Sequence, residues 1–272
     1  MRQSLRPICL AMLLCCSVLP GLAQNANVVA ASPDMSLFQK KLYISSAGDT
    51  LQYRILYPEG YEQGGKYPLF IFLHGSGERG SDNEKQLTHG GALFLADSNR
   101  KQFPAIVVFP QCPQNESWTN ITVNRQADHN EFIFDYSQPM KRPLQRTLNL
   151  ILALIATEKV NKKKVFLSGL SLGGMGTFEL VYHAPAVFHA AAPICGGGDT
   201  ASYNRQTAKV PFRIFHGADD QSVNVQYSRD MVKRLENLKA KKVSYIEYPG
   251  VKHDSWNNAF AEPDFLAWFW KQ

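Results

Sequence analysis

Ser171 lies between two glycines in the segment 165–176, which reads VFLSGLSLGGMG. The apolar, β-branched run before the serine predicts a strand, and the residues after it predict a helix. Gly169 and Gly173 carry no Cβ, so the backbone can turn sharply and project the serine hydroxyl from the strand end. The pattern indicates a nucleophile elbow, although a serine that merely caps a helix after a Gly-rich turn produces the same five residues.

A serine nucleophile needs a base, and in a parallel sheet the base should follow a strand. Three histidines follow predicted strands, namely His74, His216 and His253. Only His253 leaves room for an acid at a strand end between itself and Ser171. We therefore predict that His253 is the base and that His74 and His216 are hydrogen-bonded in the turns after their strands. The other four histidines are expected at the surface or at helix caps.

The acid is expected in the segment FHGADDQSV, which follows a predicted strand. Asp220 precedes Val223 and a predicted helix, so the loop can hold its carboxylate in place. Asp219 is the adjacent alternative, and either aspartate could simply cap the coming helix. The predicted task of Asp220 is to orient His253 and to stabilise its imidazolium form.

The negative charge on an attacked carbonyl oxygen needs backbone N–H donors. Leu172 follows the serine at the start of a helix, whose dipole also favours negative charge. We predict a second donor, Ser76, in the loop HGSGERG after the strand 67–73. No Walker-type lysine and Ser/Thr follow that loop, which disfavours a phosphate cradle. This chemistry needs neither a metal ion nor an organic cofactor, and we predict neither.

The elements that position these residues alternate along the chain. Expected strands cover 41–44, 51–57, 67–73, 105–109, 165–167, 187–194, 212–215 and 243–248, and expected helices cover 143–155, 172–183, 226–241 and a C-terminal stretch from 263. The first two strands alternate apolar and polar residues and predict a hairpin, whereas later strands are continuous apolar runs. This order predicts an α/β protein with a mostly parallel sheet of about eight strands and helices on both faces. The connection between 194 and 212 is too short for a cap domain, so none is predicted.

Residues 1–23 have the composition of a secretory signal peptide. Arg2 and Arg6 precede an apolar run, and small residues precede a cleavage site after Ala23. The apolar run is short for a membrane span, so we predict export to the periplasm or the medium without stable membrane insertion; an uncleaved anchor is the alternative. The rest of the chain divides into a polar leader, 24–37, and a catalytic domain, 38–272.

The net charge and the cysteines limit which binding partners, metal sites and disulfides are expected. Cleavage removes two basic residues and no acidic one, which lowers the net charge from +6 to +4. The one dense basic cluster, 162–164, precedes a strand and indicates a solvated turn, so no nucleic-acid partner is predicted, while acidic polymers stay open. Cys112 and Cys195 lack the spacing of a metal site and form either a disulfide or two buried thiols.

Together these segments resemble the α/β-hydrolase superfamily and, within it, secreted dienelactone-hydrolase-like proteins and carbohydrate esterases, a branch that includes feruloyl esterases, acetyl xylan esterases and proteins labelled predicted peptidases. The resemblance covers residues 38–271 and is carried by FLHGSGERGSDN, FPQCPQNESW, VFLSGLSLGGMGTFEL, FHGADDQSV and KHDSWNNAF. It implies the α/β-hydrolase fold, with the acid at Asp220 and the base at His253. Dienelactone hydrolases carry a cysteine at the elbow, and Ser171 instead favours ordinary esters.

The predicted activity is that of a serine carboxylic-ester hydrolase that forms an acyl-enzyme and removes acetyl or hydroxycinnamoyl groups from polysaccharides or small esters. In the insert 112–142, Trp118 is predicted to contact the substrate, and Phe132, Phe134 and Tyr136 form either an aromatic wall or packing. Two alternatives remain. One is a prolyl-oligopeptidase-like serine peptidase, whose usual second domain does not fit in 272 residues. The other is an inactive binding module on the same scaffold.

Overall fold

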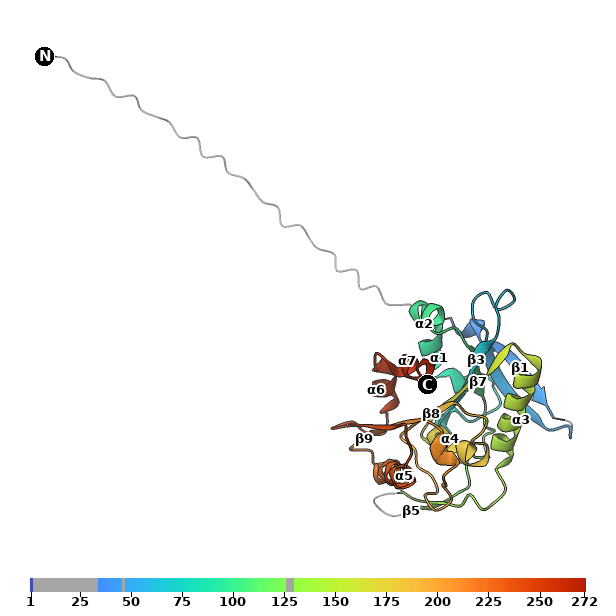
Figure 1. The fold of residues 1–272 in the computed structure, drawn as a ribbon, viewed down its shortest axis with the longest axis vertical. Helices are drawn as coiled ribbons and strands as arrows, with labels where there is room; N and C mark the ends of the chain where they lie inside the picture. Colours follow the sequence, from blue (N-terminus) through green and yellow to red (C-terminus); the bar gives the residue numbers. More distant parts are fainter. Residues whose placement is uncertain (2–33, 46, 126–129) are drawn as a thin grey trace. The chain divides into compact units, whose positions relative to one another are not determined.

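The computed structural model describes Met1 and residues 34–45, 47–125 and 130–272, so the rest of the predicted signal peptide 1–23 lies outside the described residues. Its strands are Gln39–Ile44 (β1), Thr50–Leu56 (β2), Tyr67–Leu73 (β3), Ile106–Pro110 (β4), Val160–Leu170 (β7), Ala190–Ile194 (β8), Phe212–Gly217 (β9) and Val243–Tyr248 (β10). They form one eight-stranded sheet in the order β1-β2-β4-β3-β7-β8-β9-β10 (Figure 1). The hairpin β1–β2 and the pair β2–β4 are antiparallel, and all other pairs are parallel. The predicted fold class is confirmed.

Alternate residues of the central strands face two different apolar layers. The helices are Gly91–Leu95 (α1), Asp97–Gln102 (α2), Arg142–Thr157 (α3), Leu172–His183 (α4), Gln226–Asn237 (α5), Trp256–Ala261 (α6) and Phe265–Trp270 (α7). In β3, Leu69, Ile71 and Leu73 pack in the layer that contains α3, α4 and α5. Phe70 and Phe72 pack in the layer that contains α1, α6 and α7. A strand that is apolar at every position must be covered on both faces, and both faces are covered here.

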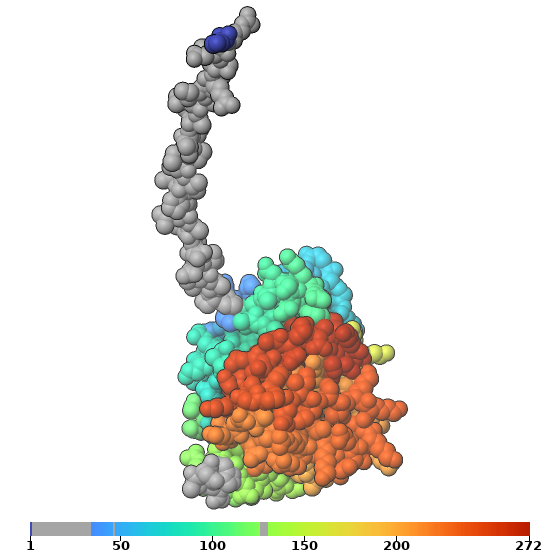
Figure 2. Space-filling model, turned by 90° about the vertical axis from the view of Figure 1, so that its left-hand side faces the viewer, coloured from blue at the N-terminus to red at the C-terminus, as the bar shows by residue number. Residues whose placement is uncertain are grey.

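The second layer joins segments that are far apart in the chain. The ring of Phe70 lies 4.8 Å from Phe94 of α1 and 4.8 Å from Phe269 of α7, both in edge-on geometry. Figure 2 shows the same proximity at the surface, where the red C-terminal segment lies beside the green segment that contains α1 and α2. Phe260 of α6 packs in the same layer, 5.8 Å from Phe72, and α6 begins three residues after His253.

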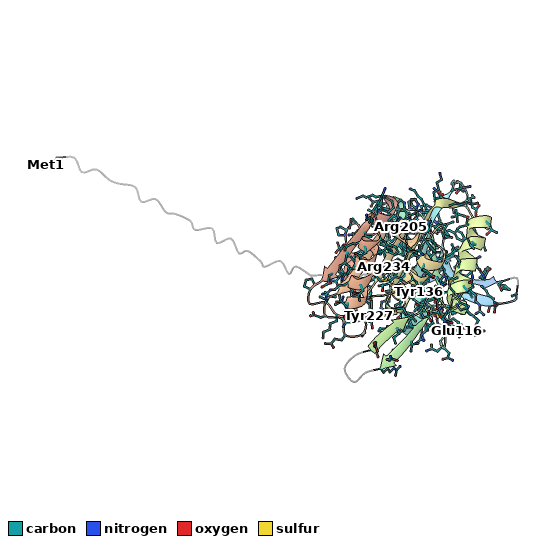
Figure 3. All side chains as sticks on the ribbon, turned by 60° about the horizontal axis from the view of Figure 1, so that its bottom comes forward. Met1, Glu116, Tyr136, Arg205, Tyr227 and Arg234 are labelled. Carbon is teal, nitrogen blue, oxygen red and sulfur yellow. The ribbon has the colours of Figure 1, made fainter. Side chains whose placement is uncertain are left out.

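The connection between β4 and α3 differs from the expectation. It contains a second, two-stranded antiparallel sheet, Ile121–Arg125 (β5) with Asn130–Phe134 (β6), where no strands were predicted. The N–H of Phe132 donates to the Tyr227 hydroxyl at 2.7 Å, and Tyr136 follows the hairpin into the core (Figure 3). The hairpin therefore packs on α5 through aromatic side chains. Helix α6 was also not predicted, whereas α7 lies where the terminal helix was expected.

The start of the domain packs on its core. Asp34 caps a 3₁₀-helix, η1 (Met35–Leu37), which belongs to the predicted leader, and Phe38 is fully buried against Phe109 at 5.4 Å.

Within the described residues, the β8–β9 connection contains a single 3₁₀-helix, η4 (Thr207–Lys209), and no cap domain. None of the described helices is long and apolar enough to cross a membrane.

Candidate active site

Ser171 occupies the sharp turn between β7 and α4. Its φ of 53° and ψ of −119° form a conformation that side-chain-bearing residues rarely adopt. A Cβ on Gly169 would overlap the carbonyl oxygen of Gly173, and a Cβ on Gly173 would overlap that of Leu73. Both glycines of the motif are therefore required, because the turn packs directly on the end of β3.

The structure brings Ser171, His253 and Asp220 together at the carboxyl edge of the sheet. Nε2 of His253 lies 2.9 Å from Oγ of Ser171, and Nδ1 of His253 lies 2.7 Å from Oδ2 of Asp220. A carboxylate only accepts hydrogen bonds, so Nδ1 carries the ring proton and Nε2 is free to accept the proton of the serine hydroxyl. The arrangement supports proton transfer from the serine to the histidine.

Two loops bring His253 to Asp220. They follow β9 and β10, which are parallel neighbours, so their carboxyl ends lie side by side. The N–H of Asp219 donates to the carbonyl oxygen of Val251 at 2.9 Å, which ties the two loops together through their backbones. Gly250, at φ 75°, makes the turn that this approach needs.

Asp220 is buried and fully hydrogen-bonded. Its Oδ1 accepts the N–H groups of Ser222 and Val223 at 2.8 and 2.9 Å, which leaves Oδ2 to face the histidine. Burial raises the pKa of Asp220, but hydrogen bonds from His216, His253 and Val223 outweigh it and hold that pKa below its ordinary value. The residue is thus kept as a carboxylate.

Asp219, the alternative acid, has an exposed side chain and meets the His253 loop only through its backbone. The residue that caps α5 is Val225, without a side-chain hydrogen bond, so neither aspartate caps that helix. Of the two candidates, only Asp220 contacts the histidine.

His216 is a second histidine on the same carboxylate. It is fully buried, and its Nε2 lies 2.9 Å from the carbonyl oxygen of Val223 and 3.2 Å from Oδ2 of Asp220. Both neighbours are acceptors, so Nε2 carries a proton. The expected hydrogen bond of His216 within its turn is present, but its contact with Asp220 was missed. The spacing of four residues between them is the signal that could have indicated it.

The loop after β3 reaches Ser171 from the opposite side. A Cβ built on Gly75 would lie 3.6 Å from the Cβ of Ser171, and the 3₁₀-helix η2 (Ser76–Glu78) follows at once. Leu172 is the first residue of α4, so its N–H has no acceptor within the helix. Ser76 and Leu172 therefore flank the nucleophile, and their role as oxyanion donors stays a prediction.

His74 fixes the peptide unit that precedes Ser76. Its Nε2 accepts the N–H of Cys112 at 2.9 Å, and its Nδ1 donates to the carbonyl oxygen of Gly75 at 2.6 Å. Burial lowers the pKa of His74 to about 4, so the ring is neutral near pH 7. Because a trans peptide points its C=O and N–H in opposite directions, this grip also directs the N–H of Ser76.

Comparison with known proteins identifies the family. The family model "Esterase" matches residues 44–256, most of the chain. The chain belongs to the Esterase family. It is also similar to the crystal structure of a thermostable esterase, at 30% identity and a TM-score of 0.78 over 88% of this chain; it spans only 64% of that protein's length. The chain matches no curated protein.

Two solved feruloyl esterases are more distant relatives of this esterase. One is a ferulic acid esterase from Anaeromyces mucronatus in complex with ferulic acid, with 16% identity, a TM-score of 0.61, and 84% and 89% of the two chains covered. The other is a mutant of the feruloyl esterase module from Clostridium thermocellum complexed with sinapinate, with 15% identity, a TM-score of 0.56, and 84% and 88% covered. At these identities the likeness shows the α/β-hydrolase fold alone. Family and fold together support the carboxylic ester hydrolysis that is proposed below.

The prediction that Trp118 contacts the substrate is wrong for this esterase. Its side chain is fully buried, its Nε1–H donates to the carbonyl oxygen of His74 at 3.0 Å, and its ring packs on the His74 ring at 5.2 Å. Trp118 therefore supports the loop after β3 from the interior. Tyr136 is also fully buried, whereas Phe132 and Phe134 are half-buried.

Cys112 and Cys195 are free and fully buried, so they are two buried thiols and not a disulfide. Cys195, Asp220 and His253 offer ligand atoms within 4.8 Å of one another, a set that could hold a metal ion. Burial raises the pKa of the Cys195 thiol and disfavours the thiolate that a metal needs. The hydrogen bond between Asp220 and His253 already accounts for the other two groups.

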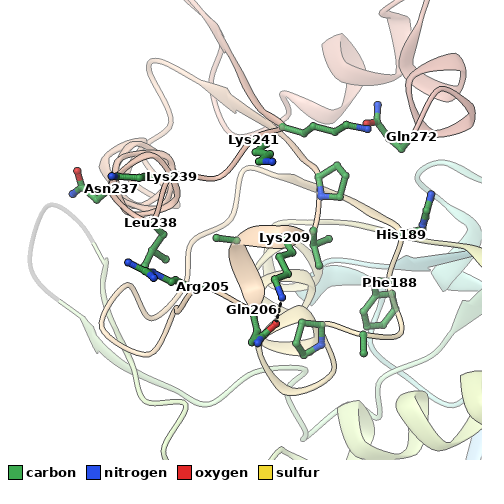
Figure 4. A pocket seen from close by; sticks show the side chains of 16 residues that line it. Phe188, His189, Arg205, Gln206, Lys209, Asn237, Leu238, Lys239, Lys241 and Gln272 are labelled. Carbon is green, nitrogen blue, oxygen red and sulfur yellow. Dashed lines mark hydrogen bonds between the residues drawn. The ribbon is translucent and has the colours of Figure 1, made fainter.

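A pocket of about 1240 Å³ lies away from this site. Its lining precedes β8, β9 and β10 in the chain, which places it at the amino edge of the sheet, and includes Arg205, Lys209, Lys239 and Lys241 (Figure 4). None of the three residues of the Ser171 relay lines it. This hollow therefore does not mark the site of chemistry.

Proposed function

We propose that the chain is a serine esterase that works through an acyl-enzyme, with Ser171 as nucleophile, His253 as general base and acid, and Asp220 as the orienting acid. The observation that carries the proposal is the continuous relay from Oγ of Ser171 through His253 to Asp220, at 2.9 and 2.7 Å. The strained serine at the strand–helix turn supports the same roles.

The steps follow from these positions. The Ser171 hydroxyl gives its proton to Nε2 of His253 while Oγ bonds to the ester carbonyl carbon, and the oxyanion forms beside the N–H groups of Leu172 and Ser76. The carbon–oxygen bond to the alcohol breaks, and His253 returns the proton to the leaving oxygen. Water then attacks the acyl-enzyme by the same steps, which releases the acid and restores Ser171.

The proposed substrates are acetyl or hydroxycinnamoyl esters of polysaccharides or of small alcohols. Two distant relatives bind ferulic acid and sinapinate, which are free hydroxycinnamic acids. The short β8–β9 connection supports an open site suited to an acyl group that projects from a bulky polymer. The proposed partners are these esters, without nucleic acid and without stable membrane insertion.

The test compares wild type with Ser171→Ala on p-nitrophenyl acetate, methyl ferulate and acetylated xylan. Hydrolysis should fall by about 10⁴-fold or more in the variant, as expected when a triad member is removed. Wild type that is folded but cleaves none of the three esters would overturn the proposal. Cleavage of a Pro-containing peptide in that case would replace it with the peptidase, and cleavage of neither would leave the binding module.

We further propose that residues 1–23 direct export and are removed, so that the leader 24–37 and the catalytic domain 38–272 form the mature protein. The support is the signal-like composition of the segment. Mass spectrometry of the protein recovered outside the cytoplasm should give an N-terminus at Gln24. An N-terminus at Met1 in a membrane fraction would show the uncleaved anchor instead.

A further inference from the structure

Glu78 stands beside the nucleophile without a hydrogen-bond partner. A Cβ built on Gly75 would lie 3.1 Å from Oε2 of Glu78 and 3.6 Å from the Cβ of Ser171, so the carboxylate and the serine flank the same backbone position. The Glu78 side chain retains only 13% exposure. Within the described residues its carboxylate accepts no hydrogen bond, and Nε2 of His89 lies 3.6 Å from Oε1.

This position is costly for the enzyme's own reaction. The Glu78 carboxylate accepts no hydrogen bond from the described residues, yet its oxygens are not among the fully buried unpaired atoms, so their acceptor sites are open to water or to a ligand. A negative charge next to Ser171 opposes the oxyanion that forms there. Glu78 therefore does not stabilise the transition state directly, and its place is best explained by hydrogen-bond donors that arrive with the substrate.

The carboxylate belongs to a continuous wall on one side of Ser171. The wall runs from Glu78 to His89, from His89 to Trp256 at a ring distance of 4.9 Å, and from Trp256 to His253 at 5.6 Å in edge-on geometry. His89 is 31% exposed at its side chain, and Trp256 is half-buried, so both retain surface for a ligand. The three residues come from η2, from the segment before α1 and from the start of α6.

The chemistry of the reaction decides which part of the ester meets this wall. His253 must return its proton to the leaving oxygen, so the alcohol lies on the His253 side of the attacked carbon. Trp256 packs against that same histidine. The wall therefore faces the alcohol and not the acyl group. An aromatic ring beside a carboxylate and an imidazole provides a flat apolar surface together with acceptors for hydroxyl groups.

We propose that Glu78, His89 and Trp256 form a subsite for the sugar ring of the ester's alcohol, with the ring stacked on Trp256 and its hydroxyls donating to Glu78. The inference rests on the proposed serine esterase function and adds the chemical class of the alcohol, a neutral sugar rich in hydroxyl groups.

The experiment uses three substrates on the full chain. They are p-nitrophenyl acetate, methyl ferulate with hydroxyl groups only on the acyl side, and an acetylated methyl xyloside with hydroxyl groups only on the alcohol side. Glu78→Gln should lower the ratio of kcat/KM for the xyloside to kcat/KM for p-nitrophenyl acetate by about tenfold or more, as expected for lost hydrogen bonds to a charged group. Its kcat on p-nitrophenyl acetate should rise, because the charge that opposes the oxyanion is gone.

Glu116→Gln is the matched control, because Glu116 is a partly exposed glutamate of the neighbouring loop that pairs with Arg142 at 3.7 Å. It should leave the ratio at the wild-type value. Trp256→Ala should lower the ratio and Trp256→Phe should restore it, since either aromatic ring offers a stacking face.

Three results would overturn the subsite. Equal losses on all three substrates would make Glu78 and Trp256 supports of the catalytic centre, and an unchanged ratio would remove any role in binding. A selective loss on methyl ferulate would place the wall on the acyl side. Failure of the serine esterase proposal can be told apart from failure of the subsite, because Ser171→Ala would then hydrolyse every ester at the wild-type rate.

Discussion

Within the part of the chain that the structure describes, two carboxylate side chains without any exposure have different surroundings. The side chains of Asp220 and Glu179 both have no exposure. Glu179 accepts hydrogen bonds from the Thr119 hydroxyl at 2.5 Å and from the backbone and side-chain N–H groups of Asn120 at 2.7 and 2.8 Å. Asp220 instead contacts the rings of two histidines, one of which reaches Ser171.

The difference shows that burial and charge do not assign a role to a carboxylate. Glu179 accepts its hydrogen bonds from neutral donors on a loop, whereas the His183 ring stays at 3.7 Å, and these bonds hold the segment after β4 against α4. In the proposed mechanism the ring of His253 makes Asp220 one end of a proton relay, because the histidine passes on the effect of the carboxylate to the reacting hydroxyl. The identity of the donors decides the role.

Changing Asp220 should have the largest effect. Asp220→Asn keeps an oxygen for the N–H groups of Ser222 and Val223 but loses the charge that selects the Nδ1–H form of His253. We expect kcat to fall by about 10⁴-fold with a folded protein, measured on p-nitrophenyl acetate. Asp219→Asn, an identical change at the exposed neighbour, is the control and should keep kcat. An equal loss of kcat in both variants would contradict the assignment of Asp220 as the acid.

Glu179→Ala should show the opposite pattern, with lost stability and little change in kcat per folded molecule. Three donors lose their acceptor inside the core, which should lower the free energy of unfolding by about 3 kcal/mol or more. Urea denaturation gives this value, and labelling of Ser171 with a fluorophosphonate counts the folded enzyme. If Glu179→Ala were as stable as wild type but had a lower kcat, Glu179 would have a catalytic role and not a structural one.

His74 should give the stability of the protein a pH dependence. Burial lowers its pKa from 6.5 to about 4, so between these values the unfolded chain binds a proton that the folded chain does not. Stability should therefore decline as the pH falls from about 6.5 to about 4, by about 3 kcal/mol in total, and His74 should contribute nothing above that window.

Asp220 affects stability at lower pH than His74 does. Because its pKa is depressed in the folded protein, it contributes stability above about pH 4, and this contribution is lost only in stronger acid. Urea unfolding of wild type and His74→Gln across pH 4.5 to 7.5 separates the two groups. The variant should lack the decline assigned to His74. A decline that persists unchanged in His74→Gln would move its origin to another residue.

Trp118→Phe should have the smallest effect. The change removes the hydrogen bond to the carbonyl oxygen of His74 and leaves a small void, so we expect about 1–2 kcal/mol of lost stability. KM for methyl ferulate should not change, since the side chain has no exposure. A raised KM at unchanged stability would restore Trp118 as a substrate contact.

Much of the site was accessible from the sequence, because its key features are local. The glycines around Ser171 act on the backbone of their own turn, and the alternation of apolar strands and helices marks which residues follow a strand. The rule that catalytic residues follow strands then brought Ser171, Asp220 and His253 to one edge of the sheet. None of these inferences needed to know how distant segments pack.

Only the tertiary structure decided which side chains face inward and which segments meet. Trp118 follows a strand end, where an aromatic residue looks the same in sequence whether it lines a cleft or fills the core. Glu179 finds its partners about sixty residues away, and the wall of Glu78, His89 and Trp256 joins η2 to the last sixth of the chain. Such contacts depend on the packing of two apolar layers, and no periodicity within a segment carries that information.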